Sequence, residues 1–484
     1  MMKNDFNYSQ DINFKILKVI SQCKDTQIYS NIMSDIFKNG PTKSSIYIQS
    51  MNILPILSES ELKKNFIKNI NKIISYIKNI TNNPNHEFYR ILSCIYGGFL
   101  GDAMGAFCEN DKPSKYNGNK IFNYDITVIG GVKGQVTDDS EMALSLAYAI
   151  MDNPNRDYLN TDYIYFYYGA WFRTNPLDYG HTTKNALKNF DFNEFNPNLN
   201  QFQKLEGTII QKNYNSLSNG FLMRKSPFIV WYYYRFYNEI SYVFNKNDID
   251  SFYLLYKKIR DLSYLDNKIT NPNYQTNVAS GFYCLMALMA IYGFNSQNII
   301  EKIYNLCKSN YFINPKIEDD EKIVSQHIIN YINLFKSPKF DIDKEFGDLN
   351  SSESVYINMG YYLHALKLTL YFLCKFEGFG GTPEFRGYKS IMNKICELGG
   401  DTDTNCCIVG AVIGPLIGLS GFQDYFIQMI NVIPPHRAIY SVALAVLFVI
   451  YLKKSTYDNN LVLNDKYFLQ QILTMLYGDI DLNG

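Results

Sequence analysis

The sequence has no surplus charge of either sign and no cluster of soft metal ligands. Its 484 residues include 46 Lys and Arg and 46 Asp and Glu, so no net positive field would gather a polyanion, and nucleic acid is not indicated as a partner. The nine cysteines form no CxxC pair, and the five histidines are scattered along the chain. This pattern argues against a structural zinc site and favours a reducing compartment.

Long apolar runs are missing as well. The polar stretch from Met1 to Asp11 lacks the apolar run of a signal peptide. The longest apolar run, Ala438 to Leu452, is shorter than the roughly 18 to 20 residues that a membrane-spanning helix needs. We therefore expect a buried core helix at this run, in a cytoplasmic protein with no membrane partner.

Runs of short alternating strands are also absent, and apolar residues instead recur at helical spacing. Hydrophobic residues make up 46% of the chain and charged residues 19%, which is enough to build a buried core. From Glu87 onward, long helical patterns alternate with polar loops. The sequence therefore predicts an all-α fold.

The same patterns divide the chain into three parts. We expect a small helical N-terminal extension at residues 1–85, a main domain at 86–455, and a C-terminal helical tail at 456–484 that packs on the main domain. Two polar stretches, Phe190 to Leu205 and Asn314 to Asp348, interrupt the helical pattern. They are predicted to be surface loops or insertions.

The first motif is a helix with glycine on one face. Gly97, Gly101 and Gly105 lie four residues apart, so their missing side chains would let another backbone approach closely. Tight helix packing is the ordinary explanation of such spacing. It leaves two acids unexplained, Asp102 inside the apolar helix and Glu109 just beyond it.

The second pattern is a pair of helix starts that carry crowded carboxylates. Asp138 and Asp139 follow Thr137 before one apolar helix, and Asp401 and Asp403 open another. N-capping would explain a single Asp at a helix start, but a second like charge needs other compensation. Carboxylate and hydroxyl oxygens without His or Cys suit magnesium, and two such ions can neutralise a phosphate-bearing substrate. A metal-dependent hydrolase is one hypothesis, and N-capping remains the alternative.

Five runs of sequence together resemble the ADP-ribosylglycohydrolase family, which includes the dinitrogenase-reductase-activating glycohydrolase. They are GDAMGAFCE at 101–109, VTDDSEMAL at 136–144, SNGFLMR at 218–224, GYYLHALKLTLYFL at 360–373 and LGGDTDTN at 398–405. The runs occur in the family's order, and the resemblance covers about residues 88 to 450. The combination of TDDS with GGDTDT is the most specific part of it.

The resemblance implies a compact all-helical fold with a two-metal centre in a central cleft. It implies two Mg²⁺ ions, with Mn²⁺ as a substitute, and hydrolysis of the glycosidic bond between ADP-ribose and a modified protein side chain or small molecule. The metal ligands carried over from the family are Thr137, Asp138, Asp139, Asp401, Asp403 and Thr404. Thr402 lies between ligands and is not assigned to the metal.

The resemblance also assigns the substrate contacts and the proton acceptor. The residues that match a substrate-binding loop and the helix after it are Ser218, Asn219, Gly220 and Arg224. Backbone N–H groups of such a loop can hold a diphosphate. His181 either lines the cleft or makes a structural hydrogen bond. Glu109 and Asp139 are the candidates that accept a proton from water, and Glu109 is expected to position substrate without being an essential ligand.

The chain departs from the family pattern at one loop, and two other functions are possible for it. Relatives often have Thr-His where this chain has Thr270-Asn271, so the role of that loop is open. The chain is alternatively a catalytically inactive ADP-ribose-binding or structural relative, or a metal phosphohydrolase that acts on nucleotides. The enzyme is favoured because a scaffold has no reason to keep four repelling carboxylates.

Overall fold

The protein has an all-α architecture, as the sequence predicted. The computed structural model describes residues 87–113, 136–153, 158–172, 176, 178–190, 201–313, 319–376 and 387–422. Within these ranges there are 16 α-helices, two 3-10 helices and no β-strand. The extension at 1–85, the tail at 456–484 and the apolar run at 438–452 lie outside the described residues, so the domain boundaries remain predictions.

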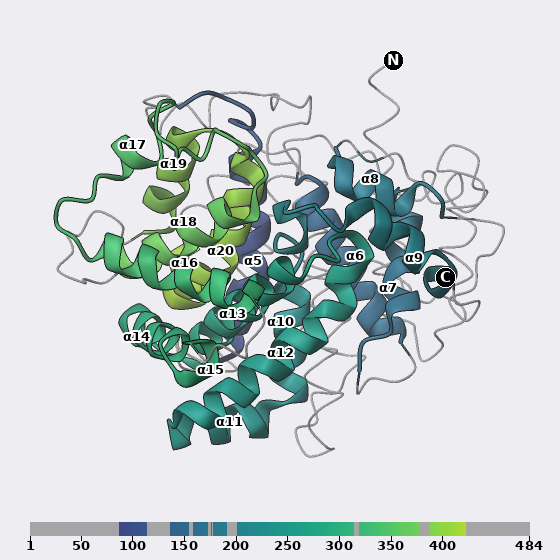
Figure 1. The fold of residues 1–484 in the computed structure, drawn as a ribbon, viewed down its shortest axis with the longest axis horizontal. Helices are drawn as coiled ribbons and strands as arrows, with labels where there is room; N and C mark the ends of the chain where they lie inside the picture. Colours follow the sequence, from purple (N-terminus) through teal and green to yellow (C-terminus); the bar gives the residue numbers. More distant parts are fainter. Residues whose placement is uncertain are drawn as a thin grey trace, which may run out of the picture.

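The helices follow one another along the chain, with the labels given in Figure 1. They are α5 (Glu87–Gly105), α6 (Asp138–Asp152), α7 (Thr161–Phe172), α8 (His181–Leu187), α9 (Gln201–Asn213), η3 (Asn219–Phe221), α10 (Ser226–Arg235), α11 (Tyr237–Lys246), α12 (Ile249–Thr270), α13 (Tyr274–Tyr292), α14 (Ser296–Cys307), α15 (Asn310–Ile313), α16 (Asp319–Phe335), α17 (Ile342–Glu345), α18 (Tyr362–Lys375), α19 (Tyr388–Leu398), α20 (Thr402–Ile417) and η5 (Leu419–Phe422). None of the helices in these ranges is long and apolar enough to cross a bilayer.

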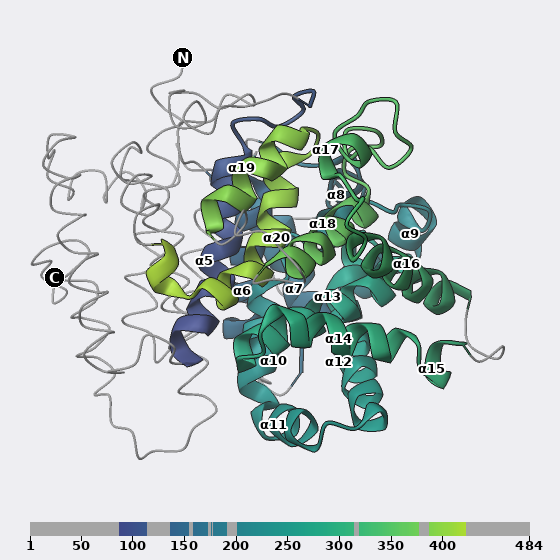
Figure 2. The same ribbon diagram turned by 90° about the vertical axis from the view of Figure 1, so that its left-hand side faces the viewer.

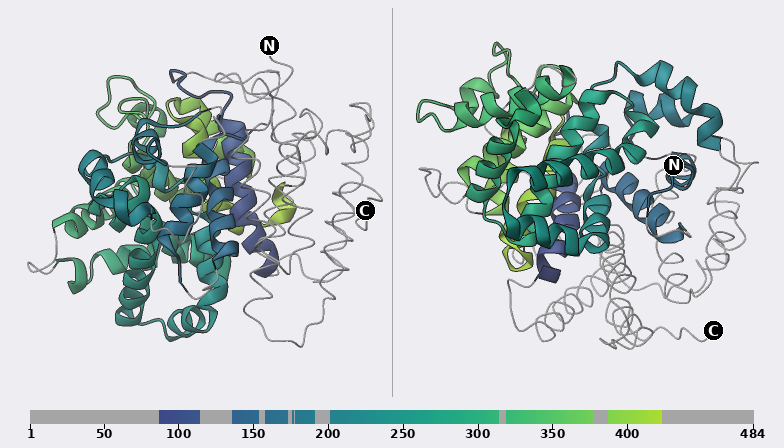
Figure 3. Two further views of the ribbon diagram at one scale, coloured as in Figure 1. Left: turned by 90° about the vertical axis from the view of Figure 1, so that its right-hand side faces the viewer. Right: turned by 60° about the horizontal axis from the view of Figure 1, so that its bottom comes forward.

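Helices α5 and α20, called the central pair below, lie side by side although they come from opposite ends of the described chain (Figures 2 and 3). The glycines of α5 face the backbone of α20. A Cβ atom added to Gly101 would lie 2.2 Å from the carbonyl oxygen of Cys406, and one added to Gly105 would lie 2.5 Å from the Cα of Asp403. The glycine spacing thus serves tight helix packing, and this contact brings Asp403 against the end of α5.

Replacing Gly101 with Ala should therefore destabilise the protein by about 3 kcal/mol, because the new methyl group would overlap backbone atoms that cannot turn away. Gly98 provides the matched control on the same helix, since its added Cβ would meet atoms only at 3.6 Å. The Gly98→Ala variant should stay within about 1 kcal/mol of the wild type. Thermal unfolding of the three proteins measures the difference, and equal midpoints for the two variants would contradict this packing.

Both polar stretches that were predicted as loops contain helix. The stretch Asn314 to Asp348 holds α16 and α17, and α9 begins within the stretch Phe190 to Leu205. The loop prediction is wrong for these parts because the average polarity hid an amphipathic pattern. On α16 the apolar side chains recur at helical spacing and are buried. They are Val324, Ile328, Tyr331, Ile332 and Phe335.

Candidate metal centre

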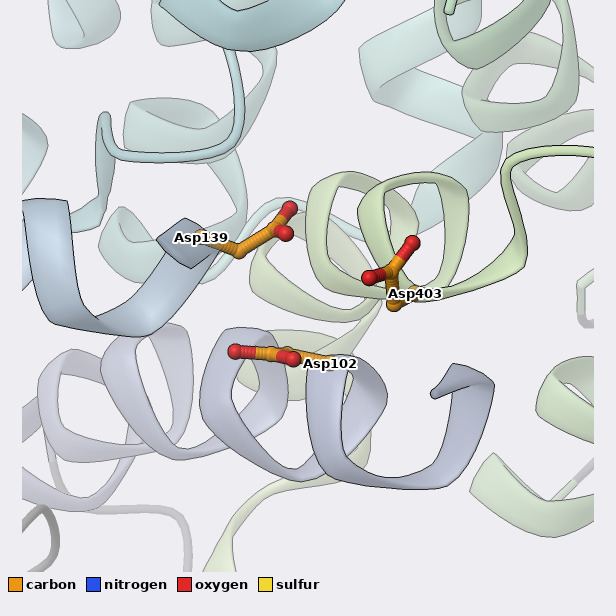
Figure 4. Close-up of side chains that lie close together, drawn as sticks. All are labelled: Asp102, Asp139 and Asp403. Atoms are coloured by element: carbon orange, nitrogen blue, oxygen red, sulfur yellow. The ribbon is translucent and has the colours of Figure 1, made fainter. Parts of the chain in front are cut away.

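Acidic side chains from three helices converge at one end of the central pair (Figure 4). Asp102 of α5, Asp139 of α6 and Asp403 of α20 each offer a carboxylate oxygen, and the three oxygens lie within 4.8 Å of one another. Glu109, Asp401 and Asp403 form a second group by the same measure. Asp403 belongs to both groups, so the chain forms two adjoining acidic positions that share one carboxylate.

Asp102 caps helix α6 from outside that helix. Its carboxylate accepts hydrogen bonds from the backbone N–H of Thr137 at 3.0 Å and of Ser140 at 3.1 Å, and from the Ser140 hydroxyl. Thr137 occupies the N-cap position but makes no capping bond with its side chain. The Thr137 side chain therefore does not cap the helix, because the carboxylate of Asp102, 35 positions upstream, accepts from the N–H groups at the helix start.

Asp139 is held by two hydroxyl groups on one oxygen and is left free on the other. Its Oδ2 accepts from the Thr137 hydroxyl at 2.8 Å and from the Thr404 hydroxyl at 3.4 Å. Its Oδ1 is buried and has no hydrogen-bond partner among the described residues. A buried carboxylate oxygen without a donor is costly, and a cation would compensate it. Thr137 and Thr404 thus orient a ligand candidate.

The second acidic position is arranged in a similar way. The Oδ1 of Asp403 accepts from the backbone N–H of Thr404 at 2.8 Å. Asp401 is half-buried, and its Oδ2 accepts from the side-chain amide of Asn219 at 2.7 Å. Glu109 accepts from Asn110 through Oε1 at 3.2 Å, while its buried Oε2 has no partner among the described residues. Each acidic position therefore includes one orphaned oxygen.

The electrostatics of the cluster disfavour full ionisation without a counter-charge. Burial raises the pKa of Asp139 and of Asp403 well above the ordinary value, and the neighbouring carboxylates raise both further. Burial, followed by the charges of Asp178 and Asp401, raises the pKa of Glu109 to about 8. Like charges held close together in a low-dielectric site explain these shifts. A divalent cation would reverse them.

Asp138 and Asp178 lie beside the cluster. Asp138 belongs to neither group of converging oxygens in the described structure. Its pKa is raised well above the ordinary value by burial and then by the charge of Asp178. Asp178 was not among the predicted site residues. The only signal in the sequence was its position three residues before His181, and nothing in its spacing shows that its loop returns to the two acidic helix starts.

The predicted substrate loop lies directly against the acidic cluster. Ser218 and Tyr361 form an isolated antiparallel bridge, and Asn219 donates its backbone N–H to Gly360 at 2.7 Å. Gly220 is half-buried, and a Cβ added there would meet only the sulfur of Met223 at 4.0 Å. The backbone at Gly220 can therefore be approached closely by a ligand.

Arg224 lies beneath the predicted substrate loop. Its side chain is fully buried, and its Nε donates to Asp266 at 3.1 Å. Arg224 thus supports the loop from beneath, and its direct contact with substrate stays a prediction. His181 is exposed at the start of α8, and the hydroxyl of the adjacent Thr182 lies 3.3 Å from that of Ser218. The structure thus brings the His181 segment to the substrate loop.

The donor set fits hard divalent cations. All the converging side chains offer oxygen, and no cysteine or histidine belongs to either group in the described residues. Oxygen-only sites of this kind suit Mg²⁺ or Mn²⁺ and not Zn²⁺. Either group could hold a metal ion, and Asp403 belongs to both.

Comparisons with known proteins identify the family. The family model described as ADP-ribosylglycohydrolase matches residues 83–454, which is more than half of the chain. A protein of Acanthamoeba polyphaga mimivirus, named provisionally as an ADP-ribosyl glycohydrolase, is 27% identical over 338 residues, 68% of this chain and 86% of that protein. A solved structure described as an ADP-ribosylglycohydrolase-related protein complex aligns with a TM-score of 0.46 at 16% identity, covering 76% of this chain and 99% of that one.

Proposed function

The chain belongs to the ADP-ribosylglycohydrolase family, and we propose that it uses two magnesium ions to hydrolyse the bond between ADP-ribose and a modified protein side chain or small molecule. The observation that carries the proposal is the pair of acidic positions that share Asp403 and each hold an orphaned carboxylate oxygen. A protein that neither catalysed a reaction nor bound a metal would be more stable if neutral residues replaced these buried carboxylates.

The ligands of the two ions follow from the two groups. Asp139 and Asp403 would hold the first ion, and Glu109, Asp401 and Asp403 the second. Thr137 and Thr404 would hold Asp139 in place, and both were predicted as ligands themselves. When bound, such ions orient substrate hydroxyls and lower the pKa of a water molecule. We assign Asp102 to the positioning of α6, because its carboxylate is engaged with the start of that helix.

The chain's own residues would perform the remaining steps. Hydrolysis at the anomeric carbon of the ribose passes through a positively charged oxocarbenium-like state, which the carboxylates of the cluster would stabilise. Asp139 or Glu109 would accept the proton of the attacking water, since each has a buried carboxylate oxygen with no hydrogen-bond partner among the described residues. The backbone at Gly220 would lie against the diphosphate. Asn219 would hold the Asp401 carboxylate against the substrate loop through its side-chain amide.

The test is the magnesium-dependent release of free ADP-ribose from an ADP-ribosylated protein. We expect release with MgCl₂, retained release when MnCl₂ replaces it, and none after chelation. If the protein released inorganic phosphate from a nucleotide but no free ADP-ribose from the modified protein, the phosphohydrolase hypothesis would be favoured. Binding of ADP-ribose without any turnover would favour the inactive relative. Peptides labelled at a defined arginine or serine would then identify the linkage.

Replacing Glu109 with Gln should lower turnover by about 100-fold and weaken magnesium binding, because one carboxylate oxygen of Glu109 lies within 4.8 Å of carboxylate oxygens of Asp401 and Asp403. The sequence had predicted a role in positioning substrate or accepting a proton, with magnesium binding retained. Calorimetric titration of magnesium beside a turnover assay separates the two roles. Glu397→Gln on α19 is the control. Lost turnover with unchanged magnesium affinity would return Glu109 to the role that the sequence predicted.

A further inference from the structure

A buried ionic cluster lies beneath the substrate loop. Asp266 accepts hydrogen bonds from the guanidinium of Arg224 at 3.1 Å, from the ammonium of Lys225, and from the hydroxyl of Tyr168 at 2.7 Å. The side chains of Arg224, Lys225 and Asp266 are fully buried. Burial alone would raise the pKa of Asp266, but the two cations hold it below its ordinary value. Asp266 is therefore an ionised anchor for Arg224.

A continuous series of hydrogen bonds leads away from this anchor. The Nη2 of Arg224 donates to the Thr270 hydroxyl at 2.8 Å, and that hydroxyl donates to the Oδ1 of Asn271 at 2.8 Å. The Nδ2 of Asn271 donates to the carbonyl oxygen of Ser218 at 3.1 Å and to its hydroxyl at 2.9 Å. Arg224 thus holds the loop at Ser218 through two intermediate side chains.

The series ends at the acidic cluster. Asn219 follows Ser218 in the chain, and its side-chain amide donates to the Oδ2 of Asp401 at 2.7 Å. Asn219 is the one side chain of the described structure that hydrogen-bonds Asp401, and Asp401 makes no capping bond at the start of α20. The conformation of the Asp401 carboxylate therefore depends on where Asn219 is placed.

We propose that Arg224, Thr270 and Asn271 are positioning residues that set the Asp401 carboxylate for the metal centre through Ser218 and Asn219. Every side-chain hydrogen bond in the series donates toward Asp401, and the aligned bonds between Arg224 and Ser218 polarise and strengthen one another. Partners that orient a ligand typically change metal affinity by roughly 10- to 100-fold when they are lost. The proposal rests on the proposed metal centre, and it gives a role to the Thr270-Asn271 loop.

The test variant is Thr270→Val, which removes one hydroxyl and keeps the shape of the side chain. Metal-free full-length protein is titrated with MgCl₂ in a calorimeter, so the measurement does not depend on turnover. We expect magnesium binding to weaken by about tenfold and Thr270→Ser to restore it. Thr369→Val on α18 is the matched control, because its hydroxyl is equally buried and bonds only the carbonyl oxygen of Ala365. If Thr270→Val does not fold, Asn271→Ala breaks the next link.

A double-mutant cycle with Asn219→Ala separates positioning from general destabilisation. If the relay acts through Asn219, Thr270→Val should not weaken magnesium binding further in the Asn219→Ala background. Additive losses, or a Thr270→Val protein that binds magnesium like the wild type, would overturn the relay and leave the proposed function standing. A wild-type protein that binds no magnesium would overturn the metal centre and the relay together.

Discussion

Replacing Asp403 with Asn should reduce kcat/KM by roughly a thousandfold, because a shared ligand of two ions is worth about 4 kcal/mol of transition-state stabilisation. Asp403 is the one residue common to both groups of converging carboxylate oxygens among the described residues. Its loss would therefore weaken both positions at once, whereas loss of Asp139 or Asp401 would weaken one directly. Steady-state turnover of an ADP-ribosylated substrate measures the effect, and calorimetry measures the accompanying loss of magnesium binding.

The same substitution should leave the fold intact and raise the stability of the metal-free protein. Without a cation, burial and the neighbouring carboxylates disfavour the ionised form of Asp403, and a neutral amide at this position removes that cost of folding. Asp162→Asn on α7 is the control, because Asp162 is also buried but lies outside both acidic groups. An Asp403→Asn protein with normal turnover would contradict the metal assignment.

The metal-free protein should lose stability as the pH rises from about 5 to about 8. Burial raises the pKa of Glu109 from 4.5 to about 8, and it raises those of Asp139 and Asp403 well above the ordinary value. In this window the unfolded chain has released these protons while the folded protein still holds them, so unfolding becomes progressively easier. Magnesium should oppose the loss, because it binds the ionised carboxylates of the folded protein.

Thermal unfolding at pH 5, 6, 7 and 8, with a chelator and with MgCl₂, measures this dependence. Burial lowers the pKa of His364 from 6.5 to about 4, so this residue adds stability as the pH rises toward 6.5 and partly offsets the loss there. Lys367, whose burial lowers its pKa to about 8, adds stability mainly above the window. The loss should therefore be clearest between pH 6.5 and 8, with a shallower slope for Asp403→Asn. A metal-free midpoint that is flat or rises between pH 6.5 and 8 would contradict the proposed repulsion.

Charge repulsion also bears on the rival hypothesis of an inactive relative. The cluster keeps two orphaned carboxylate oxygens and several like charges in a buried place. Each is unfavourable for folding unless a cation binds. A chain that had lost both catalysis and metal binding would tolerate neutral residues at these positions, and this one retains the acids. The retained charges therefore favour a functional metal centre.

Local sequence patterns were sufficient for the parts of the structure that depend on neighbours along the chain. The helical class follows from apolar spacing, because a helix buries residues three and four positions apart. The close approach at Gly101 follows from glycines four apart, because they share one helical face. Average composition misled at Asn314 to Asp348, where a narrow apolar stripe on α16 was enough to bury one side of a polar helix.

The sequence by itself determined that this chain is helical and that it places paired carboxylates at two helix starts. Only the tertiary structure decided where each charged side chain lies. Asp102 caps α6, Arg224 lies buried under the loop, and Asp178 approaches the cluster from a separate segment. The physical reason is that charges interact through space, with a strength set by distance and burial, and neither quantity can be calculated from spacing along the chain before the helices are packed.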